Sequence, residues 1–534
     1  FAALLINLVH VCAPGLLERK PDFVCRFATA LIRVRLPGTK QERGFYSEAE
    51  YDAFRRDRIS RNLPTGTAKY YKGLGTSSAE LAKQYFSELR ANTIVLRYEG
   101  VACSEAFDLF FNKGRADDRK RVLSADASGD DTCDPIDYSL DCVSMERFVR
   151  GELLPAYAMA AIVRGIPALD GLNQARRKIL WGARALNVVH DTVSVANLAG
   201  KISAKSNYHH RGTAMEDSII GMAADYVGCG NINLLIPEGQ FGSRHSHEAA
   251  SAAYPKTALN HPVHALVYPP ADDAILEYVS DEGMFVEPTC YVPVIAMALC
   301  FGTDGIAVGW STKCSCYDPK VLVRASEAVL SGSPIPELVP HYRGFTGEIR
   351  KEEESVFVVR GCAEYQGEDL HITEGPPFRE TDAYKEEWLK NEELAPHGVL
   401  PGSGHTSEKV HTIVRKAKRF DDPVKAYGLE KRIAFRNVHL LDAEGRVKKY
   451  ESPEEVVRDH ARMRLEAYSR RLAHQVKQLE REVHLALVKA RFVSDCLADR
   501  FVMKEHDDDD AAVNALRKQG YDDDPDVLGQ LLRM

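Results

Sequence analysis

A glycine-rich turn, Lys72-Gly73-Leu74-Gly75-Thr76-Ser77, combines backbone N–H groups, two hydroxyls and an ammonium beside a predicted helix start. Such a combination suits a phosphate group, because both the N–H groups and the positive end of the helix dipole favour an anion. The lysine precedes the glycines, so the turn does not have the order of a Walker A loop. A purely structural turn is the alternative interpretation, and this segment alone does not decide between the two.

Three adjacent cations, Arg176-Arg177-Lys178, lie just inside a second predicted helix start, after the segment Ala168-Leu169-Asp170-Gly171-Leu172. Positive charges at a helix N-terminus oppose the helix dipole, so they indicate an anion nearby. DNA phosphate is one candidate for that anion. The alternative is a solvated basic face without a specific ligand.

Two further segments bring polar and aromatic side chains together. Tyr208-His209-His210-Arg211 could assist acid–base chemistry at a phosphate, or fill a core or supporting role. Adjacent histidines on a helix point about 100° apart and do not make a metal pair of the i, i+4 kind. The segment Gly239-Gln240-Phe241-Gly242-Ser243-Arg244 and the small residues Ala249 to Ala253 precede Tyr254 in a predicted exposed loop. The chain has 22 tyrosines, so an ordinary surface tyrosine is the alternative there.

The hydrophobic periodicity predicts the elements that position these groups. Residues 1–17 are expected to form a helix, with strands within Phe27–Leu36 and a helix from Ser47 to Arg55. Alternating helix and strand patterns up to residue 100 favour a parallel α/β domain. The polar stretch Ser124 to Asp137 is typical of a linker. Residues 145–325 mix short helices with frequent Gly and Pro.

The last third of the chain changes character. Short alternating runs within residues 330–450 predict an antiparallel or mixed β region. No Gly or Pro occurs from Glu454 to Gln519, and apolar residues from Leu465 to Leu487 recur every three or four positions. That pattern predicts a long amphipathic helix, and its mean spacing above 3.5 favours a straight helix pair over a tightly wound coil. About 45 such residues would make a rod nearly 70 Å long.

Composition bounds the class of protein. The 534-residue chain is 45% hydrophobic and 27% charged, which is typical of a multidomain globular protein and excludes wholesale disorder. Its net charge of −8 taken alone argues against a nucleic-acid partner, but residues 504–526 hold nine acids and three bases, so the remainder is close to neutral. The 12 scattered cysteines indicate an intracellular, reducing environment. No apolar run reaches the roughly 18–20 residues that span a bilayer.

Taken in order, these segments resemble the DNA-cleavage core of eukaryotic-type type IIA DNA topoisomerases. The segments that carry the resemblance are Lys69–Ser77, Ala116–Lys120, Asp170–Lys178, Leu198–Gly200, Tyr208–His210, Asn233–Gly242, the Tyr254 loop, Pro269-Pro270, Glu287-Pro288 and Gly305–Ser311. The sequence Q-F-G at 240–242 favours the eukaryotic or large-DNA-virus branch of the family.

The resemblance implies a multidomain α/β and α+β fold. Residues 1–123 would be the C-terminal part of a TOPRIM α/β domain, followed by a linker at 124–144 and a winged-helix domain with the tyrosine at 145–329. A β-rich tower at 330–450 and long antiparallel coiled-coil helices at 451–534, leading to the C-gate, would follow. A chain that starts with Phe1 inside helical periodicity is expected to begin within a domain.

The resemblance also implies roles for single residues. Tyr254 would attack a DNA phosphodiester and become linked to the 5′-phosphate, an ester that conserves the bond energy for religation. His209, His210 and Arg177 match residues that act at the scissile phosphate. Ile306 matches an apolar wedge that inserts between base pairs and bends the duplex. The other residues expected to contact DNA are Lys69, Lys72, Gly75, Asp170, Lys178, Lys201, Gln240, Arg211 and Arg244.

Two positions depart from the family pattern. The family has an arginine immediately before the nucleophile, and Ala253 occupies that place here. Losing one such stabilising group typically costs about 10²–10³ in rate, so Arg211 or Arg244 is expected to compensate. The second departure is Asn173-Gln174, where the family commonly has Lys-Pro.

The implied activity is that of an ATP-dependent type IIA topoisomerase, which passes one duplex through a transient break in another and so relaxes or decatenates DNA. The implied partners are double-stranded DNA, as gate and transported segments, and a second copy in a homodimer, with no membrane. Mg²⁺ and ATP are the implied cofactors. The Mg²⁺ ligands are expected upstream of Phe1 and the ATP-binding domain outside this chain, so no metal ligand is assigned.

The implied localisation is the nucleus, or a cytoplasmic viral factory or virion if the source is viral. A cleavage-deficient DNA-bending or scaffold protein that kept the fold is the main alternative function. A coiled-coil interaction protein is suggested only by residues 454–505.

Overall fold

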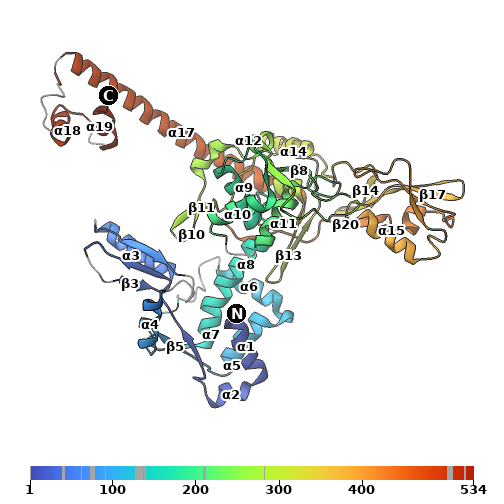
Figure 1. Ribbon diagram of the computed structural model, residues 1–534, viewed down its shortest axis with the longest axis horizontal. Helices are drawn as coiled ribbons and strands as arrows, with labels where there is room; N and C mark the ends of the chain where they lie inside the picture. The colour runs from blue at the N-terminus through green and yellow to red at the C-terminus, as the bar shows by residue number, and fades with distance from the viewer. Residues whose placement is uncertain are drawn as a thin grey trace. The chain divides into compact units, whose positions relative to one another are not determined.

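The chain divides into two compact units in a computed structural model (Figure 1). The structure describes residues 2–38, 42–61, 63–71, 78–90, 92–126, 136, 140–208, 212–281, 283–498, 500–501, 509–521 and 525–533. The first unit comprises residues 1–269 and 276–461, and the second comprises 270–275 and 462–534. None of the described helices is long and apolar enough to cross a membrane.

Two small sheets and six helices form the first 126 residues. The helices are α1 (Ala2–Cys12), α2 (Pro14–Arg19), α3 (Glu48–Ser60), α4 (Ala79–Ser87), α5 (Val101–Phe111) and α6 (Ala116–Asp126). The strands are β1 (Val24–Phe27), β2 (Ile32–Arg35), β3 (Glu42–Phe45), β4 (Thr67–Tyr70) and β5 (Thr93–Arg97). The predicted helix over 1–17 is split in two, because Pro14 lacks an N–H and starts α2. The helix predicted from Ser47 is confirmed, with the Ser47 hydroxyl capping α3.

The expectation of a parallel α/β domain is wrong for this part of the chain. Strand β2 is antiparallel to both β3 and β4, and β1 is antiparallel to β5. Residues 36–41 connect β2 to β3, and so short a link permits a hairpin but not a parallel crossover. Only β6 (Cys142–Ser144) runs parallel to its neighbour β5 among these described strands, after the long connection through α5 and α6.

Residues 145–331 form a group of helices with small sheets. The helices are α7 (Met145–Phe148), a π-helical stretch Val149–Tyr157, α8 (Ala158–Gly165), α9 (Gln174–Ala185), α10 (Val195–Lys205), α11 (Gly212–Ala223), α12 (His261–Val267), α13 (Met297–Phe301) and α14 (Pro319–Ser331). The strands are β7 (Val193–Ser194), β8 (Leu235–Glu238), β9 (Lys256–Leu259), β10 (Tyr278–Asp281), β11 (Met284–Pro288), β12 (Thr303–Ala307) and β13 (Trp310–Cys314). Strand β9 lies between β7 and β8 and is antiparallel to both. Helix α9 approaches α10 closely at Gly182, where a Cβ would lie 2.9 Å from Ile202.

The β-rich region predicted for residues 330–450 is confirmed as antiparallel sheets (Figure 1). Its strands are β14 (Glu348–Glu353), β15 (Val356–Arg360), β16 (Cys362–Gln366), β17 (Asp369–Glu374), β18 (Val399–Pro401), β19 (Thr412–Val414), β20 (Glu430–Ala434), β21 (Val438–Leu441) and β22 (Val447–Tyr450). Helices α15 (Thr381–Lys390) and α16 (Pro423–Ala426) accompany them. Leu370 and Ile372 of β17 pack with Trp388 of α15 in one buried cluster, so α15 is fixed to this sheet.

The predicted long helix is confirmed as α17 (Pro453–Leu497), which is 45 residues long. In the second unit, α18 (Asp509–Lys518) and α19 (Pro525–Leu531) pack beside its end through a cluster that includes Phe492, Leu516 and Leu528. The apolar stripe of α17 is exposed at Leu465, Leu472, Val476, Leu479, Val483 and Leu487. The antiparallel coiled coil stays a prediction, because no second long helix occurs among the described residues.

Candidate active site

Tyr254 stands on the long excursion between β8 and β9, with 79% of its surface exposed. The two strands pair antiparallel and bring Glu238 opposite Lys256, so the excursion leaves and rejoins the sheet at one point. The Gln240 side chain braces it, since its Oε1 accepts the N–H groups of Gly242 (3.2 Å) and Ala250 (2.9 Å). The sheet and this brace hold the backbone of the loop while the tyrosine faces solvent.

The start of α10 supports the loop on the other side of Tyr254. The Val195 N–H donates to the Pro255 carbonyl (3.0 Å), and the Ala196 N–H donates to the Ala252 carbonyl (2.9 Å). The first N–H groups of a helix have no partner inside the helix, so they are available for such contacts. The backbone on both sides of Tyr254 is therefore fixed to a helix end.

Asp170 and Arg177 form an ion pair inside the protein, with 0% and 3% of their surfaces exposed. Arg177 donates from Nε to Asp170 Oδ2 (2.9 Å), and from Nη2 to Asp170 Oδ1 (3.1 Å) and to the Leu172 carbonyl (2.9 Å). Burial alone would lower the pKa of Arg177, but the Asp170 carboxylate outweighs it and the pKa is raised. The expectation that Arg177 acts at a phosphate and that Asp170 contacts DNA is therefore wrong: each neutralises the other in the core.

Lys178 is buried in the same way. Its ammonium donates to Glu287 Oε2 (2.7 Å) and to the Ser206 carbonyl (2.8 Å), with 4% of the residue exposed. The expectation that Lys178 contacts DNA is wrong in this conformation, because its charge is already matched by a carboxylate. The solvated basic face considered as an alternative is excluded for Arg177 and Lys178 by the same burial.

Arg244 is 7% exposed, and its guanidinium binds the Glu374 carboxylate, which is 1% exposed. It therefore does not supply the cation expected to compensate for Ala253, and its predicted contact with DNA is corrected. The sequence could not show this, because 130 residues separate the two partners.

Three of the predicted DNA contacts do lie on the surface. Lys69, on β4, is exposed and holds its ammonium 5.1 Å from the centre of the Tyr71 ring. Lys201 is exposed on α10. Ile306 is 79% exposed on the hairpin of β12 and β13. The hairpin sits so close to the end of α8 that a Cβ on Gly305 would lie 2.1 Å from the Gly165 carbonyl oxygen.

Five predicted site residues lie outside the residues that the structure describes: Lys72, Gly75, His209, His210 and Arg211. Their proposed roles stay predictions.

Lys256 is a candidate that the sequence analysis missed. It is exposed two residues after Tyr254 and makes no ion pair with the described residues. Side chains two residues apart on an extended chain point to the same side, so Lys256 could have been found from the spacing alone. Its charge is the nearest one to the tyrosine along the chain.

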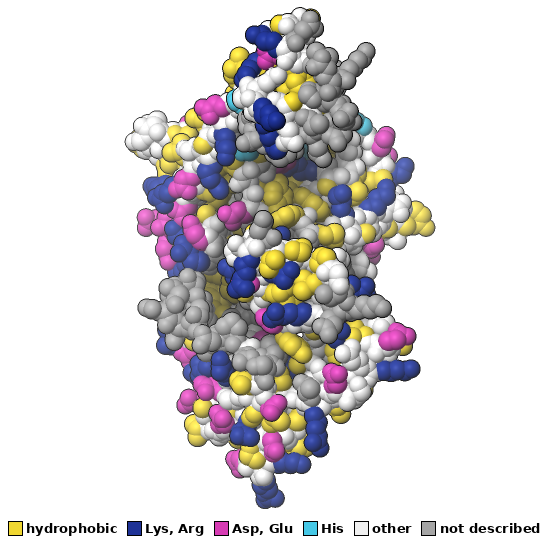
Figure 2. All heavy atoms as spheres, turned by 90° about the vertical axis from the view of Figure 1, so that its left-hand side faces the viewer, with side chains coloured by type: hydrophobic (Ala, Val, Ile, Leu, Met, Phe, Trp, Pro, Cys, Tyr) yellow, Lys and Arg dark blue, Asp and Glu magenta, His cyan; other side chains and the backbone are white. Residues whose placement is uncertain are grey.

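Metal and surface charge offer little further guidance. Within the described ranges, no group of three or more His, Cys, Asp or Glu side chains is arranged to hold a metal ion. The cysteines that the structure describes are free thiols. On the face shown in Figure 2, Lys and Arg side chains are intermixed with Asp and Glu side chains, as the net charge of −8 would suggest.

Comparison with known proteins places the site in a family. The family model described as DNA gyrase/topoisomerase IV matches residues 164–523. The chain belongs to the type II DNA topoisomerase family. A second model, the C-terminal associated domain of TOPRIM, matches residues 27–161 and runs across the predicted linker at 124–144. The first of these matched stretches contains both Tyr254 and Ile306.

The relatives support the resemblance to eukaryotic topoisomerases. The chain is 36% identical to DNA topoisomerase 2 of Arabidopsis thaliana over 97% of its own length and 36% of that protein. It is 31% identical to DNA topoisomerase 2-alpha of Mus musculus over 98% of its own length and 35% of that protein. The chain thus spans about a third of the length of these curated relatives.

A solved structure shares the architecture. The crystal structure of the DNA-binding, cleavage and re-ligation domain of Plasmodium falciparum topoisomerase II aligns with a TM-score of 0.87 at 29% identity. The alignment covers 98% of this chain and 72% of that one. The sequence-based recognition of a type II topoisomerase core is confirmed.

Proposed function

We propose that this chain is the DNA cleavage and religation core of a type II DNA topoisomerase, with Tyr254 as its nucleophile. The observation that carries the proposal is the exposure of Tyr254 (79%) on a loop whose backbone is held by β8, β9 and α10. The likeness to a solved domain named for DNA binding, cleavage and re-ligation supports it. A preorganised backbone with an exposed hydroxyl suits attack on a large substrate that arrives from solvent.

In the proposed reaction, the Tyr254 hydroxyl loses its proton to water and its oxygen bonds to a DNA phosphorus. The bond from phosphorus to the 3′-oxygen breaks, and the 3′-oxygen takes up a proton. Religation reverses these steps, and the phosphotyrosyl ester conserves the energy of the broken bond. Lys256 would place its ammonium beside the phosphate as negative charge builds on its oxygens, a form of stabilisation that can be worth about 10²–10³ in rate.

Ile306 would act on the same duplex from the β12–β13 hairpin. An exposed apolar side chain on a rigid hairpin can insert between base pairs and bend the DNA, at a cost of about a few kcal/mol that contacts to the bent duplex offset. Gly165 and Gly305 fix the hairpin against α8 by their close approach. Lys69 and Lys201 would contact phosphates, because both are exposed cations.

The wider activity and partners are part of the proposal. The whole protein would act on double-stranded DNA as an ATP-dependent homodimer in the nucleus, relaxing or decatenating DNA, as suggested by its relatives, which are named DNA topoisomerase 2. Mg²⁺, when bound, would neutralise charge on the scissile phosphate. Its ligands and the ATP site are proposed to lie outside the described residues, so no step is assigned to them.

A cleavage-deficient DNA-bending protein is the second candidate. Ala253 stands where the family has an arginine, and Arg244 is held by Glu374 and is not available in its place. Both observations favour weaker cleavage, while the exposed Ile306 would still bend DNA.

The deciding experiment uses the full gene product that carries this chain. The wild-type protein and a Tyr254→Phe variant are incubated with supercoiled circular DNA and Ca²⁺, then denatured with detergent and digested with protease. We expect linear DNA from the wild type and none from Tyr254→Phe. Normal binding and bending without any break in the wild type would favour the scaffold function instead.

A further inference from the structure

We infer that Glu374, at the end of β17, is a positioning residue for DNA cleavage that acts through Arg244 on the loop carrying Tyr254. The inference rests on the proposed function. It assigns to the β-rich region a part in aligning the nucleophile, in addition to any contact that this region makes with DNA.

Glu374 and Arg244 form a buried junction between two segments that are far apart in sequence. Arg244 donates from Nη1 to Glu374 Oε2 (3.4 Å) and makes a second, shorter contact from Nη2 to Oε1. Glu374 is also held on its own side, accepting from the Thr346 N–H (3.0 Å), the Thr346 hydroxyl (2.7 Å) and the Gly375 N–H (3.0 Å). A carboxylate fixed by so many donors can locate the guanidinium that it binds.

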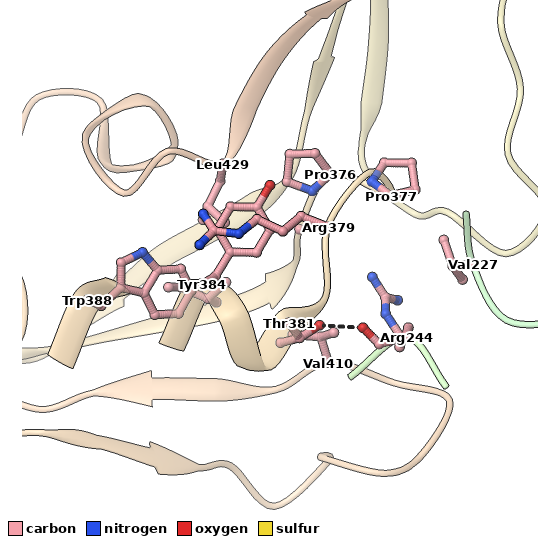
Figure 3. A pocket seen from close by; sticks show the side chains of 12 residues that line it. Val227, Arg244, Pro376, Pro377, Arg379, Thr381, Tyr384, Trp388, Val410 and Leu429 are labelled. Carbon is pink, nitrogen blue, oxygen red and sulfur yellow. Dashed lines mark hydrogen bonds between the residues drawn. The ribbon is translucent and has the colours of Figure 1, made fainter. Parts of the chain in front are cut away.

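The start of α15 holds the backbone of the same loop segment. The N–H and hydroxyl of Thr381 both donate to the Arg244 carbonyl at 3.1 Å, and the Asp382 N–H donates to the His245 carbonyl at 3.2 Å. Figure 3 shows the hydroxyl contact between Thr381 and Arg244. Helix α15 has no side-chain cap of its own at Glu380, so the loop carbonyls satisfy N–H groups that the helix leaves open.

A third contact extends this grip along the loop. The His247 N–H donates to Glu380 Oε1 at 2.8 Å, and the His247 ring stacks on Tyr226 at 4.8 Å between ring centres. Gly242 lies so near that a Cβ there would be 2.7 Å from the His247 carbonyl oxygen, and its φ of +92° favours glycine. Residues 242–247 are thus held as one compact turn against β17 and α15.

The turn is coupled to Tyr254 by short links. Gln240, just before it, accepts a hydrogen bond from the Ala250 N–H at 2.9 Å. The Tyr254 N–H then donates to the Ser251 carbonyl at 2.9 Å. A shift of the turn therefore moves the backbone that orients the nucleophile, and misplacement by about 1 Å can cost about 10²-fold in rate.

The test replaces Glu374 with glutamine in the full gene product, because Glu374→Gln removes the charge and keeps the shape. The matched control is Glu430→Gln, which removes a partly buried carboxylate that binds Arg360 in the same β-rich region and does not touch the loop. Three quantities are measured for each variant: the rate of covalent DNA adduct formation, the affinity for uncleaved DNA, and the thermal unfolding midpoint.

We expect Glu374→Gln to slow adduct formation about 10–100-fold while DNA affinity stays within about twofold of the wild type, and Glu430→Gln to change neither. The inference is overturned if Glu374→Gln cleaves at the wild-type rate, or if adduct formation and DNA affinity fall together in proportion to a loss of folded protein.

A double variant, Arg244→Met with Glu374→Met, covers the case in which Glu374→Gln does not fold. Replacing a buried ion pair by apolar residues of similar size is often neutral for stability. The folded double variant should still cleave slowly, and wild-type cleavage by it would overturn the inference. No adduct from the wild-type protein would instead refute the proposed function, and the inference with it.

Discussion

Arg177→Ala is expected to destabilise the first unit strongly, because it leaves a carboxylate unpaired in the core. Asp170 is 0% exposed and would keep only two donors, the N–H groups of Leu172 (2.9 Å) and Tyr291 (3.0 Å). Removing one partner of a buried ion pair typically costs about 3–5 kcal/mol. Arg177→Ala also deprives the Leu172 carbonyl of its donor, which adds to the cost.

A compensating variant separates charge from shape. Arg177→Met combined with Asp170→Asn removes both charges, keeps one side-chain oxygen that can accept from a backbone N–H, and fills the volume of the arginine stem. We expect this double variant to recover much of the lost stability, because no charge is left unpaired.

The assay compares urea unfolding of the three proteins with their DNA affinity as a function of salt. If Arg177 instead held a DNA phosphate, Arg177→Ala would leave the free energy of unfolding within about 1 kcal/mol of the wild type. It would also reduce the salt dependence of binding by about one released counterion. That pair of results would refute the assignment of Arg177 to the core.

Three further predictions concern single side chains. Lys256→Ala should slow adduct formation by about 10²-fold in a single-turnover assay while Lys256→Arg retains most of the rate, and equal rates for the alanine variant would exclude a role at the phosphate. Ile306→Ala should reduce DNA bending, measured by energy transfer between dyes at the duplex ends, and an unchanged bend would exclude the wedge. His264 is 5% exposed, and burial lowers its pKa from 6.5 to about 4. Between those two pH values only the unfolded chain takes up the proton, so the free energy of unfolding should fall by about 3 kcal/mol as the pH drops. His264→Gln should flatten that dependence in thermal melts at pH 7.5 and 5, and an equal slope in both proteins would contradict it.

Local patterns were enough to predict several elements. The recurrence of apolar residues from Leu465 to Leu487 predicted α17, because helix periodicity is a property of neighbouring residues. The alternating runs within residues 330–450 predicted the antiparallel strands for the same reason. The parallel domain expected before residue 100 was wrong, since strand direction depends on how the connections fold back and not on the strands themselves.

The partners of the charged residues could not be predicted in this way. Lys178 is matched by Glu287, which lies 109 residues further along the chain, and Arg244 by Glu374 at a separation of 130. A cation in a sequence looks like surface until the fold brings an acid to it. Tyr254 was the opposite case, because the glycine and small residues before it predicted an exposed loop correctly.

Mass spectrometry can locate the proposed covalent bond itself. DNA trapped on the full gene product is digested with nuclease and the protein with protease, and the nucleotide-bearing peptide is sequenced. We expect a nucleotide joined through its 5′-phosphate to Tyr254, with a free 3′-hydroxyl on the other DNA end and no such peptide from Tyr254→Phe. A nucleotide on another residue, or one joined through its 3′-phosphate, would contradict the assignment of Tyr254 as the nucleophile.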